Sequence, residues 1–533
     1  MPSDCIDFKA TGYFSSLICD YLEEKAALKP FYNRFPNADN FLDQIKEKQD
    51  HFLTETRTVL HNVLQSQYKG FSISEGTQQN INLLKSNNTF TITTGHQLNL
   101  FTGPLYFLYK IISTINLCRE LSEKHRKYNF VPVYWMATED HDFDEINYFN
   151  FKGKKIQWNR PDGGAVGEFD TKGLDTVLEA YSAQLGGGKN ADQLRKLFED
   201  SYLKHDSLTD ATRHLANTLF GEYGLVIIDG NDSDLKRLFI PHLKEELLEQ
   251  TSFKVVSKSI DAFNKLEGGY KVQVNPREIN LFYLDKGIRE RLIEQDGEYL
   301  VNDQSIKFSK EGILSELNSH PEKFSPNVIL RPLYQEVILP NLCYIGGGGE
   351  LAYWLELKDM FEAFKVPFPM LLLRNSVLVK TEKQAKKQDS LEINDEELFL
   401  KRDSFINRKV RQISNITIDF SEQRALLKSH FESMFEVAKL TDQSFEGAVK
   451  AQEVKQLKGL DHLEKRLLKA QKKKLKDQVG RMTDLQEQLF PGQSLQERNL
   501  NFSELYLEHG EKLIAKLIKE LDPLSGKFLI LSL

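Results

Sequence analysis

Hydrophobic and polar positions follow two different patterns along this chain, and the pattern changes near residue 380. Before that point, short apolar runs alternate with longer stretches in which apolar residues recur every three or four positions. This alternation is typical of an α/β fold built on a parallel sheet. Helical periodicity between the runs includes residues 104–122 and 232–265. The apolar runs predict strands at residues 90–94, 130–138, 224–230, 337–345 and 368–374.

Two stretches interrupt this alternation of strands and helices. Residues from about 150 to 222 begin with a segment rich in glycine and polar side chains, and residues from about 266 to 325 mix short strand-like and turn-like pieces. We interpret both as insertions that decorate the carboxyl edge of the sheet, where long functional connections are common. The sequence therefore predicts a core domain over residues 1–380 that carries two insertions.

The second pattern is helical and highly charged. Between residues 454 and 489, Leu468, Leu475, Met482 and Leu489 are spaced by seven, which predicts a coiled coil. An upstream helical stretch at 422–450 could pair with it as an antiparallel hairpin. We expect a helical domain over 381–500 that makes a homodimer contact, followed by a C-terminal helix and tail at 501–533.

Composition limits the partners and the location. The formal net charge of −7 argues against a general affinity for nucleic acid, and the basic run at 465–476 is interleaved with acidic residues, as on a solvated coil face. A local nucleic-acid stripe there is the less favoured alternative. No apolar run approaches the roughly 18 residues of a membrane span, and the N-terminus lacks a signal sequence. We expect a cytoplasmic protein with no membrane or nucleic-acid partner.

The four cysteines are widely spaced and form no C-x-x-C pair. A structural zinc site or a disulfide framework needs clustered ligands, so neither is expected. Cys118 and Cys343 lie in apolar segments, where a small buried hydrophobic side chain is the favoured role.

The first candidate binding loop follows the predicted strand at 90–94. In an open α/β sheet, a strand end beside a helix start is where anions bind, because free backbone N–H groups and the helix dipole favour negative charge there. An ordinary turn is an equally good interpretation of this loop. The candidate phosphate or carboxylate ligands are Thr94, Gly95, His96, Gln97, Asn99 and Gly103.

An acidic cluster, "EDHDFDE" at 139–145, follows the next predicted strand. Carboxylates so crowded repel one another unless a cation offsets them, so the cluster is a candidate site. Asp140, His141 and Asp142 are the candidate catalytic residues. They could receive a substrate ammonium or hydroxyl groups, hold a divalent metal, or simply cap the next helix.

Two more segments offer groups for an anion. A run of four glycines precedes a helix expected from Glu350, and Gly347 and Gly348 would let a ligand approach the backbone closely. The run matches neither a Walker A loop nor a dinucleotide-binding fingerprint. Arg374, Asn375 and Ser376 close the last predicted strand and could meet phosphate oxygens, although a capping turn explains them equally well.

Five motifs together resemble the BshC family of bacillithiol biosynthesis. The resemblance runs nearly the full chain and keeps the motifs in order. They are "TTGHQLNLFTGPLYFLYK", "MATEDHDFDEIN", "RPLYQEVILPNLCYIGGGGELAYW", "FPMLLLRNS" and "LQERNLNF".

This resemblance implies a Rossmann-like core of the nucleotidyltransferase type, related to class I aminoacyl-tRNA synthetases, with two connecting-peptide insertions and a coiled-coil domain that supports a homodimer. It also implies addition of L-cysteine to glucosaminyl-malate. By position, Gly95 and His96 correspond to the HIGH signature of that superfamily and would contact the phosphates of ATP. A KMSKS loop is not found in this sequence.

The bond to be made requires activation of the cysteine carboxylate. We therefore expect ATP, accompanied by Mg²⁺, to convert it to an acyl-adenylate or an acyl-phosphate that the sugar amine attacks. Two other classes remain open at this point: a nucleotide-binding coiled-coil regulator or scaffold, and a metal-dependent hydrolase that uses residues 139–142.

Overall fold

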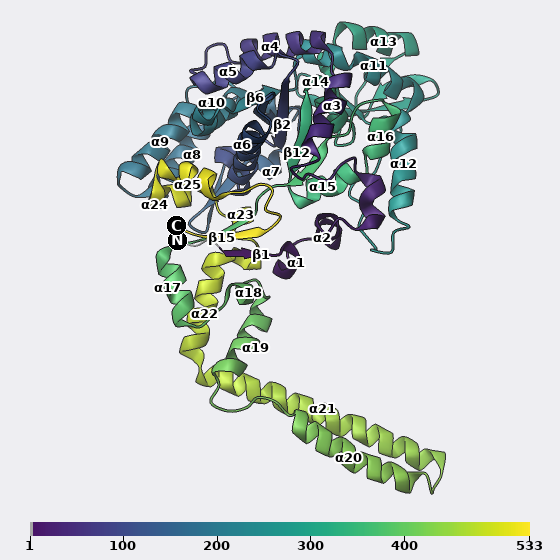
Figure 1. Ribbon diagram of the computed structural model, residues 1–533, viewed down its shortest axis with the longest axis vertical. Helices are drawn as coiled ribbons and strands as arrows, with labels where there is room; N and C mark the ends of the chain where they lie inside the picture. The colour runs from purple at the N-terminus through teal and green to yellow at the C-terminus, as the bar shows by residue number, and fades with distance from the viewer. Residues whose placement is uncertain (1–3, 162) are drawn as a thin grey trace. The chain divides into compact units, whose positions relative to one another are not determined.

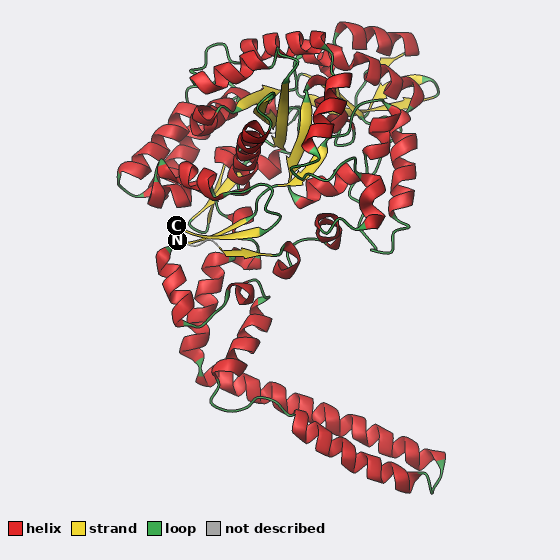
Figure 2. Ribbon diagram, viewed as in Figure 1, coloured by secondary structure: helices red, strands yellow, loops and turns green. Residues whose placement is uncertain are grey.

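The computed structural model describes residues 4–161 and 163–533, and these divide into two compact units. One unit comprises residues 3–378 and 496–531 and contains the parallel sheet; the other comprises mainly residues 379–495 and is helical. Figure 2 shows the strands gathered in the first unit and long helices in the second. Among the described residues, no helix combines the length and the apolarity that crossing a bilayer would need.

The central sheet has five parallel strands in the order β13-β12-β2-β3-β6 (Figure 1). Its inner strands are buried along nearly their whole length, as continuous apolar runs in a parallel sheet should be. The registers pair His96 with Met136, and Met136 with Asp229, so the carboxyl ends of neighbouring strands meet at one edge. The strands are β2 (Thr89–His96), β3 (Asn129–Met136), β6 (Val226–Asp229), β12 (Asn341–Gly346) and β13 (Met370–Leu373).

Helices α6 and α3 pack against the sheet, and α6 covers β2 and β3. Cys118 and Cys343 both lie in the buried apolar cluster between these elements, which confirms that they act as small hydrophobic side chains. The helices connected to the sheet are α6 (Tyr106–Lys124), α11 (Ser233–Glu249), α12 (Thr251–Phe263), α14 (Leu330–Ile338), α15 (Gly348–Leu355) and α16 (Lys358–Ala363). The N-terminal elements are β1 (Asp4–Ile6), α1 (Phe8–Thr11), α2 (Ser16–Leu22), α3 (Phe41–His51), α4 (Thr54–Gln67) and α5 (Glu75–Leu83).

Two excursions from the sheet occupy the stretches that the sequence analysis assigned to insertions. Between β3 and β6 the chain forms α7 (Phe143–Ile146), β4 (Tyr148–Phe151), β5 (Lys154–Gln157), α8 (Leu174–Leu185), α9 (Lys189–Tyr202) and α10 (Leu208–Phe220). Between α12 and α14 it forms a small antiparallel sheet with one helix. That part contains β7 (Leu281–Asp285), β8 (Ile288–Gln295), β9 (Glu298–Val301), β10 (Lys307–Phe308), α13 (Lys310–Ser319) and β11 (Phe324–Pro326).

The helical unit contains a long antiparallel hairpin of α20 and α21. After it, the chain returns to the sheet unit, where β15 pairs antiparallel with β1. The elements from residue 377 to 489 are β14 (Val377–Lys380), α17 (Glu382–Ser390), α18 (Asp395–Leu398), α19 (Arg402–Ile413), α20 (Ser421–Ala438), α21 (Gln443–Lys474) and α22 (Lys476–Leu489). The C-terminal elements are α23 (Gln496–Asn499), α24 (Phe502–His509), α25 (Lys512–Glu520) and β15 (Phe528–Ser532).

Several predicted boundaries were wrong. The first two residues of the strand predicted at 337–345 are the end of α14, and β12 begins only at Asn341, because Leu333, Tyr334 and Ile338 follow a helical period that Pro340 terminates. The helix predicted at 232–265 breaks at Gln250, which adopts a left-handed conformation with φ of 52°. The strand predicted at 90–94 extends through His96, so the expected loop residues Gly95 and His96 belong to β2.

The predicted coiled coil was also wrong in detail. The upstream partner predicted at 422–450 contains the hairpin turn, between Ala438 and Gln443. The predicted seam breaks at Leu475, where α21 ends and α22 begins. A heptad fixes the spacing of apolar residues but not their partner: α21 packs mainly on α20, whereas α22 packs on α17 and α19.

This break predicts unequal roles for two leucines of the same heptad series. Leu489 is fully buried in the helical unit, whereas Leu475 lies partly exposed at the break. Leu489→Ala should lower the free energy of unfolding by about 2–5 kcal/mol, and Leu475→Ala by about 1 kcal/mol. Urea denaturation followed by circular dichroism measures both. Equal losses would show that a continuous seam runs through Leu475.

Candidate active site

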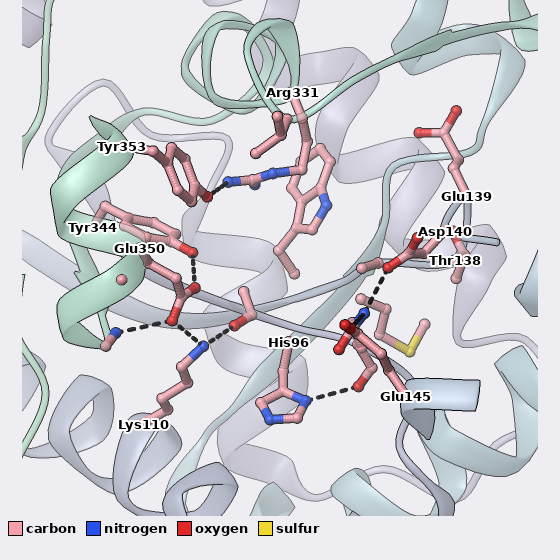
Figure 3. A pocket seen from close by; sticks show the side chains of 18 of the residues that line it. His96, Lys110, Thr138, Glu139, Asp140, Glu145, Arg331, Tyr344, Glu350 and Tyr353 are labelled. Atoms are coloured by element: carbon pink, nitrogen blue, oxygen red, sulfur yellow. Dashed lines mark hydrogen bonds and ion pairs between the residues drawn. The ribbon is translucent and has the colours of Figure 1, made fainter. Parts of the chain in front are cut away.

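A cavity of about 700 Å³ opens at the carboxyl ends of β2, β3 and β12, within the sheet unit. Figure 3 shows Lys110, Tyr344 and Glu350 on one side of it, Thr138, Asp140 and Glu145 on the other, and Arg331 above. The charged side chains among its lining residues are Lys110, Glu139, Asp140, Glu145, Arg289, Arg331, Glu350, Arg374 and Arg498.

An ion pair between the buried Lys110 and the partly exposed Glu350 joins helix α6 to helix α15 at one side of the cavity. Lys110 Nζ lies 2.5 Å from Glu350 Oε2 and donates a hydrogen bond to the Gly95 carbonyl oxygen at 2.7 Å. Tyr344 O–H and the Gly347 N–H donate to the same carboxylate at 2.6 and 2.8 Å. Burial opposes ionisation of Glu350, but Lys110 and these donors bring its pKa below the ordinary value. Glu350 therefore remains a carboxylate.

His96 lies at the end of β2 and is held as a neutral side chain. Its Nδ1 lies 2.8 Å from the Gln97 carbonyl oxygen, which can only accept, so we assign the ring proton to Nδ1. Burial, with a contribution from Lys110, lowers the pKa of His96 to about 3. Its Nε2 is buried and has no hydrogen-bond partner among the described residues. The free atom of His96 is thus an acceptor rather than a cation.

Gln97 connects two carboxylates on the opposite side of the cavity. Its Nε2 donates to Asp140 Oδ2 at 2.8 Å and to Glu145 Oε2 at 2.9 Å. Burial would raise the pKa of Asp140, but hydrogen bonds from His141 and Gln97, together with nearby Arg289, hold it well below its usual range. Asp140 is therefore ionised, as recognition of a cationic amine requires.

Not all of the acidic cluster lines the cavity. His141 and Asp142 are exposed and do not line the cavity, so the predicted catalytic trio does not share one site. His141 Nδ1 lies 2.6 Å from a guanidinium nitrogen of Arg289. Glu139 lines the cavity but is paired with the buried Lys236 at 2.5 Å. Among the described residues, no group of three or more His, Cys, Asp or Glu side chains could hold a metal ion.

The glycine run borders a guanidinium with one unused donor. Arg374 pairs with Glu497 at 2.8 Å and donates to the Ser376 hydroxyl at 3.1 Å, while its buried Nε has no partner among the described residues. A Cβ at Gly347 would lie 3.7 Å from that Nε. The first N–H groups of α15, beginning at Gly348, also lack intrahelical partners. These donors converge where an anion could bind.

Five of the predicted binding residues have structural partners and do not line the cavity. Thr94 donates to the Ile345 carbonyl oxygen. Asn99 donates to the backbone of Glu145, and a Cβ at Gly103, where φ is 60°, would lie 2.7 Å from Asn99. The two others, Asn375 and Ser376, bond to Asp522 and Glu497, respectively. The predicted residues that line it are Gly95, His96, Gln97, Gly347, Gly348, Glu350, Arg374 and Asp140, and their binding roles stay a prediction.

Sequence reasoning missed several cavity residues, among them Tyr106, Lys110, Arg331, Tyr344 and Arg498. Lys110 did carry a signal. It is the one charged residue in the apolar stretch "YFLYKIISTIN", and a lysine buried on all sides needs a carboxylate partner.

Two family models match consecutive parts of the chain, and the second also covers residues 496–531, which belong to the sheet unit. Residues 1–375 match the model for "Bacillithiol biosynthesis BshC, N-terminal Rossmann-like domain", and residues 377–533 match its C-terminal coiled-coil domain. The chain belongs to the BshC family. Family membership confirms the Rossmann-like core and the helical coiled-coil domain that the motifs predicted.

Relatives of this BshC-family chain match along its full length. Proteins named "Putative cysteine ligase BshC" are 60% identical in Flavobacterium johnsoniae, covering 100% of both chains, and 59% identical in Christiangramia forsetii, covering 100% of this chain and 99% of the relative. One from Cytophaga hutchinsonii is 38% identical over 97% of this chain and 96% of its own length. A solved structure titled "putative arginyl t-RNA synthetase" from Campylobacter jejuni covers 83% of this chain and 97% of its own, with 10% identity and a TM-score of 0.21, and does not bear on the fold.

The ion pair of this BshC-family chain predicts a pH-dependent stability. Lys110→Met should cost about 3 kcal/mol at neutral pH, because it leaves the partly buried Glu350 carboxylate without its cation. Lys110 lowers the pKa of Glu350 in the folded state, so its contribution is present above the unfolded pKa and lost as pH falls. The difference in the free energy of unfolding between the wild-type chain and Lys110→Met should therefore become smaller at acidic pH. Denaturant unfolding between pH 4 and 8 measures it.

A matched control lies at the end of the same helix. Lys124 is exposed, and its ion pair with Asp39 at 3.4 Å faces solvent. Lys124→Met should change the free energy of unfolding by less than about 0.5 kcal/mol at any pH. A pH-independent loss in Lys110→Met would contradict the assignment of Glu350 as its ionised partner.

Proposed function

We propose that this chain is an ATP-dependent ligase that joins L-cysteine to the glucosamine amine of glucosaminyl-malate. The observation that carries the proposal is a single cavity with opposite chemistry on its two sides. Asp140 and Glu145 offer carboxylates to an amine, while Arg374, Arg498 and the start of α15 offer donors to an anion. The names of the full-length relatives support cysteine as a substrate.

The nucleotide phosphates would bind on the side of the glycine run. Arg374 Nε is a buried donor without a partner, and Arg498 is exposed and forms no ion pair among the described residues. Gly349 leaves the backbone accessible, since even a Cβ there would meet nothing within 4 Å. Mg²⁺ would arrive with ATP and neutralise phosphate charge. His96, being neutral, would accept a hydrogen bond from a ligand N–H or O–H group rather than pair with a phosphate.

The amine would bind on the side of Asp140 and Glu145. Because the pKa of Asp140 is lowered, its carboxylate stays ionised and is a weak base. This suits charge recognition of an ammonium group better than removal of a proton. Gln97 fixes both carboxylates through one amide group, so the two acceptors are held in a defined geometry before the substrate arrives.

The reaction needs two bond exchanges. An oxygen of the cysteine carboxylate attacks a phosphorus atom of ATP and expels pyrophosphate or ADP, which gives an acyl-adenylate or an acyl-phosphate. The ammonium group of glucosaminyl-malate gives one proton to solvent, and its free amine nitrogen then attacks the acyl carbon. The bond from that carbon to the oxygen of AMP or phosphate breaks, and the second amine proton passes to solvent. The protein contributes position and charge rather than a covalent nucleophile.

Turnover of ATP, cysteine and glucosaminyl-malate, with mass spectrometry of the thiol product, tests this function. Asp140→Asn should lower kcat/KM for glucosaminyl-malate roughly ten- to hundredfold, the worth of a charge-assisted hydrogen bond. Asp142→Asn should change it little, since Asp142 lies outside the cavity. AMP or ADP as co-product identifies the activated intermediate.

Two outcomes would reject parts of this proposal. Binding of ATP without product or ATP turnover would favour a regulator or scaffold. If Asp142→Asn lowered kcat/KM as much as Asp140→Asn, Asp142 would belong to the active site. The site would then extend beyond the residues that line the cavity.

We also propose that the α20–α21 hairpin forms a homodimer contact. Large apolar side chains are exposed along it, although α20 and α21 already bury Phe431 and Val449 between them. Exposed apolar residues grouped in this way are typical of an interaction surface. They are Leu426, Met434, Val437, Leu440, Phe445, Val454 and Leu463, with exposed fractions from 44% to 86%.

Charge on this surface should abolish self-association. The double variant Leu426→Glu/Leu463→Glu should sediment as a monomer with its melting temperature nearly unchanged, because both leucines are more than half exposed. Lys428→Glu, an exposed charge change on the same helix, is the control and should leave the dimer intact. A wild-type chain that sediments as a monomer, or a double variant that remains dimeric, would refute the contact.

A further inference from the structure

Arg331 brings into the cavity a positive charge that no carboxylate of the described residues pairs with. The residue lies in the first turn of α14 and lines the cavity. Its guanidinium donates to Gln335 Oε1 at 3.1 Å and to the Tyr353 hydroxyl at 3.3 Å, both neutral groups. The contrast with its neighbours is clear, since Lys110 and Arg374 each form an ion pair with a glutamate.

Aromatic rings surround the Arg331 guanidinium. Its central carbon lies 5.9 Å from the ring centre of Trp135, 5.7 Å from that of Tyr344 and 6.0 Å from that of Trp354. Contacts of this kind attract a cation to the ring faces and limit its hydration. The partly exposed guanidinium is thus held in place at the cavity, where the surrounding rings reduce its contact with water and strengthen its attraction for an anion.

A buried hydrogen-bond chain fixes the orientation of Gln335. Gln335 is fully buried, and its Nε2 donates to Glu336 Oε1 at 3.0 Å. Glu336 is in turn held by Asn341 at 2.6 Å and by the buried Lys48 at 3.1 Å. Because the amide nitrogen of Gln335 faces a carboxylate, its oxygen faces Arg331. Arg331 therefore keeps a fixed direction before any ligand binds.

We propose that Arg331 is a specificity-determining residue that binds a carboxylate of the acceptor substrate, in its malate half. The identity of the acceptor rests on the proposed function, whereas the need for a carboxylate rests on the unpaired, preoriented guanidinium. Arg331 is separated from Asp140 and Glu145 across the cavity (Figure 3). One substrate with an amine and a distant carboxylate can therefore contact both sides.

The cysteine carboxylate fits this position less well. That carboxylate must attack phosphorus, and a bidentate pair with a guanidinium would occupy both of its oxygens and reduce their nucleophilicity. A carboxylate of malate does not react, so pairing it with Arg331 adds binding energy without opposing the chemistry. Binding energy from a remote, unreactive part of a substrate also positions the reacting amine.

Calorimetric titration with two glycosides tests this inference without ATP or cysteine. The wild-type chain should bind glucosaminyl-malate more tightly than methyl glucosaminide, which lacks the malate carboxylates. Arg331→Gln should weaken glucosaminyl-malate binding roughly ten- to hundredfold and leave methyl glucosaminide binding unchanged. Arg331→Lys keeps the charge without the planar fork and should be intermediate. Arg237→Gln, which changes an exposed arginine outside the cavity lining, is the control and should retain the preference between the glycosides.

Each outcome separates this inference from the proposed function. Carboxylate-dependent binding that Arg331→Gln abolishes would support Arg331 even if no ligation were detected. A wild-type chain without preference between the two glycosides would overturn it, even if the chain were an active ligase. A variant that loses affinity for cysteine but not for glucosaminyl-malate, in a fold with an unchanged melting temperature, would also overturn it.

Discussion

The pairing of Lys110 with Glu350 is the interaction on which the candidate site depends most. It joins helix α6 to the start of α15 across the ends of β2 and β12, and Lys110 also holds the last part of β2 through the Gly95 carbonyl. The buried Lys110 would be strongly destabilising alone in this position, because burial of an unpaired ion costs several kcal/mol. The same lysine helps to keep His96 neutral. One ion pair therefore holds helices α6 and α15 together and helps to keep the His96 side chain uncharged.

Much of the fold and part of the site were accessible from the order of residue types. Apolar runs predicted the parallel strands, and parallel strands bring their carboxyl ends to one edge, so Gln97 and Asp140 could be expected to meet. Arg331 and Tyr344 could not be expected there. Their place depends on how α14 and β12 pack, and a lone arginine in an apolar segment does not indicate which cavity it faces. The break at Leu475 could not be predicted for a related reason. The seven-residue spacing of apolar side chains continues even where the helix that they pack against changes.

The charged residues of the cavity have two kinds of partner. Glu139, Glu350 and Arg374 are neutralised by partners from the chain itself, and these pairs hold elements together. Asp140 instead accepts a hydrogen bond from the neutral amide of Gln97. Arg331 donates one to the neutral amide of Gln335. An amide orients a charged group without cancelling its charge. The distinction separates the groups that build the cavity from those left for a ligand.

The return of the chain at residue 496 has a consequence for biosynthesis. Glu497, the partner of Arg374, and Arg498, which lines the cavity, follow the whole helical unit in the sequence. At about 5–20 residues per second, a ribosome would need on the order of ten seconds to pass from one part of the sheet unit to the other. During that interval the Arg374 guanidinium lacks its carboxylate and β1 lacks β15. The sheet unit therefore cannot complete its cavity until residues 497 and 498 have been synthesised, when translation has almost finished.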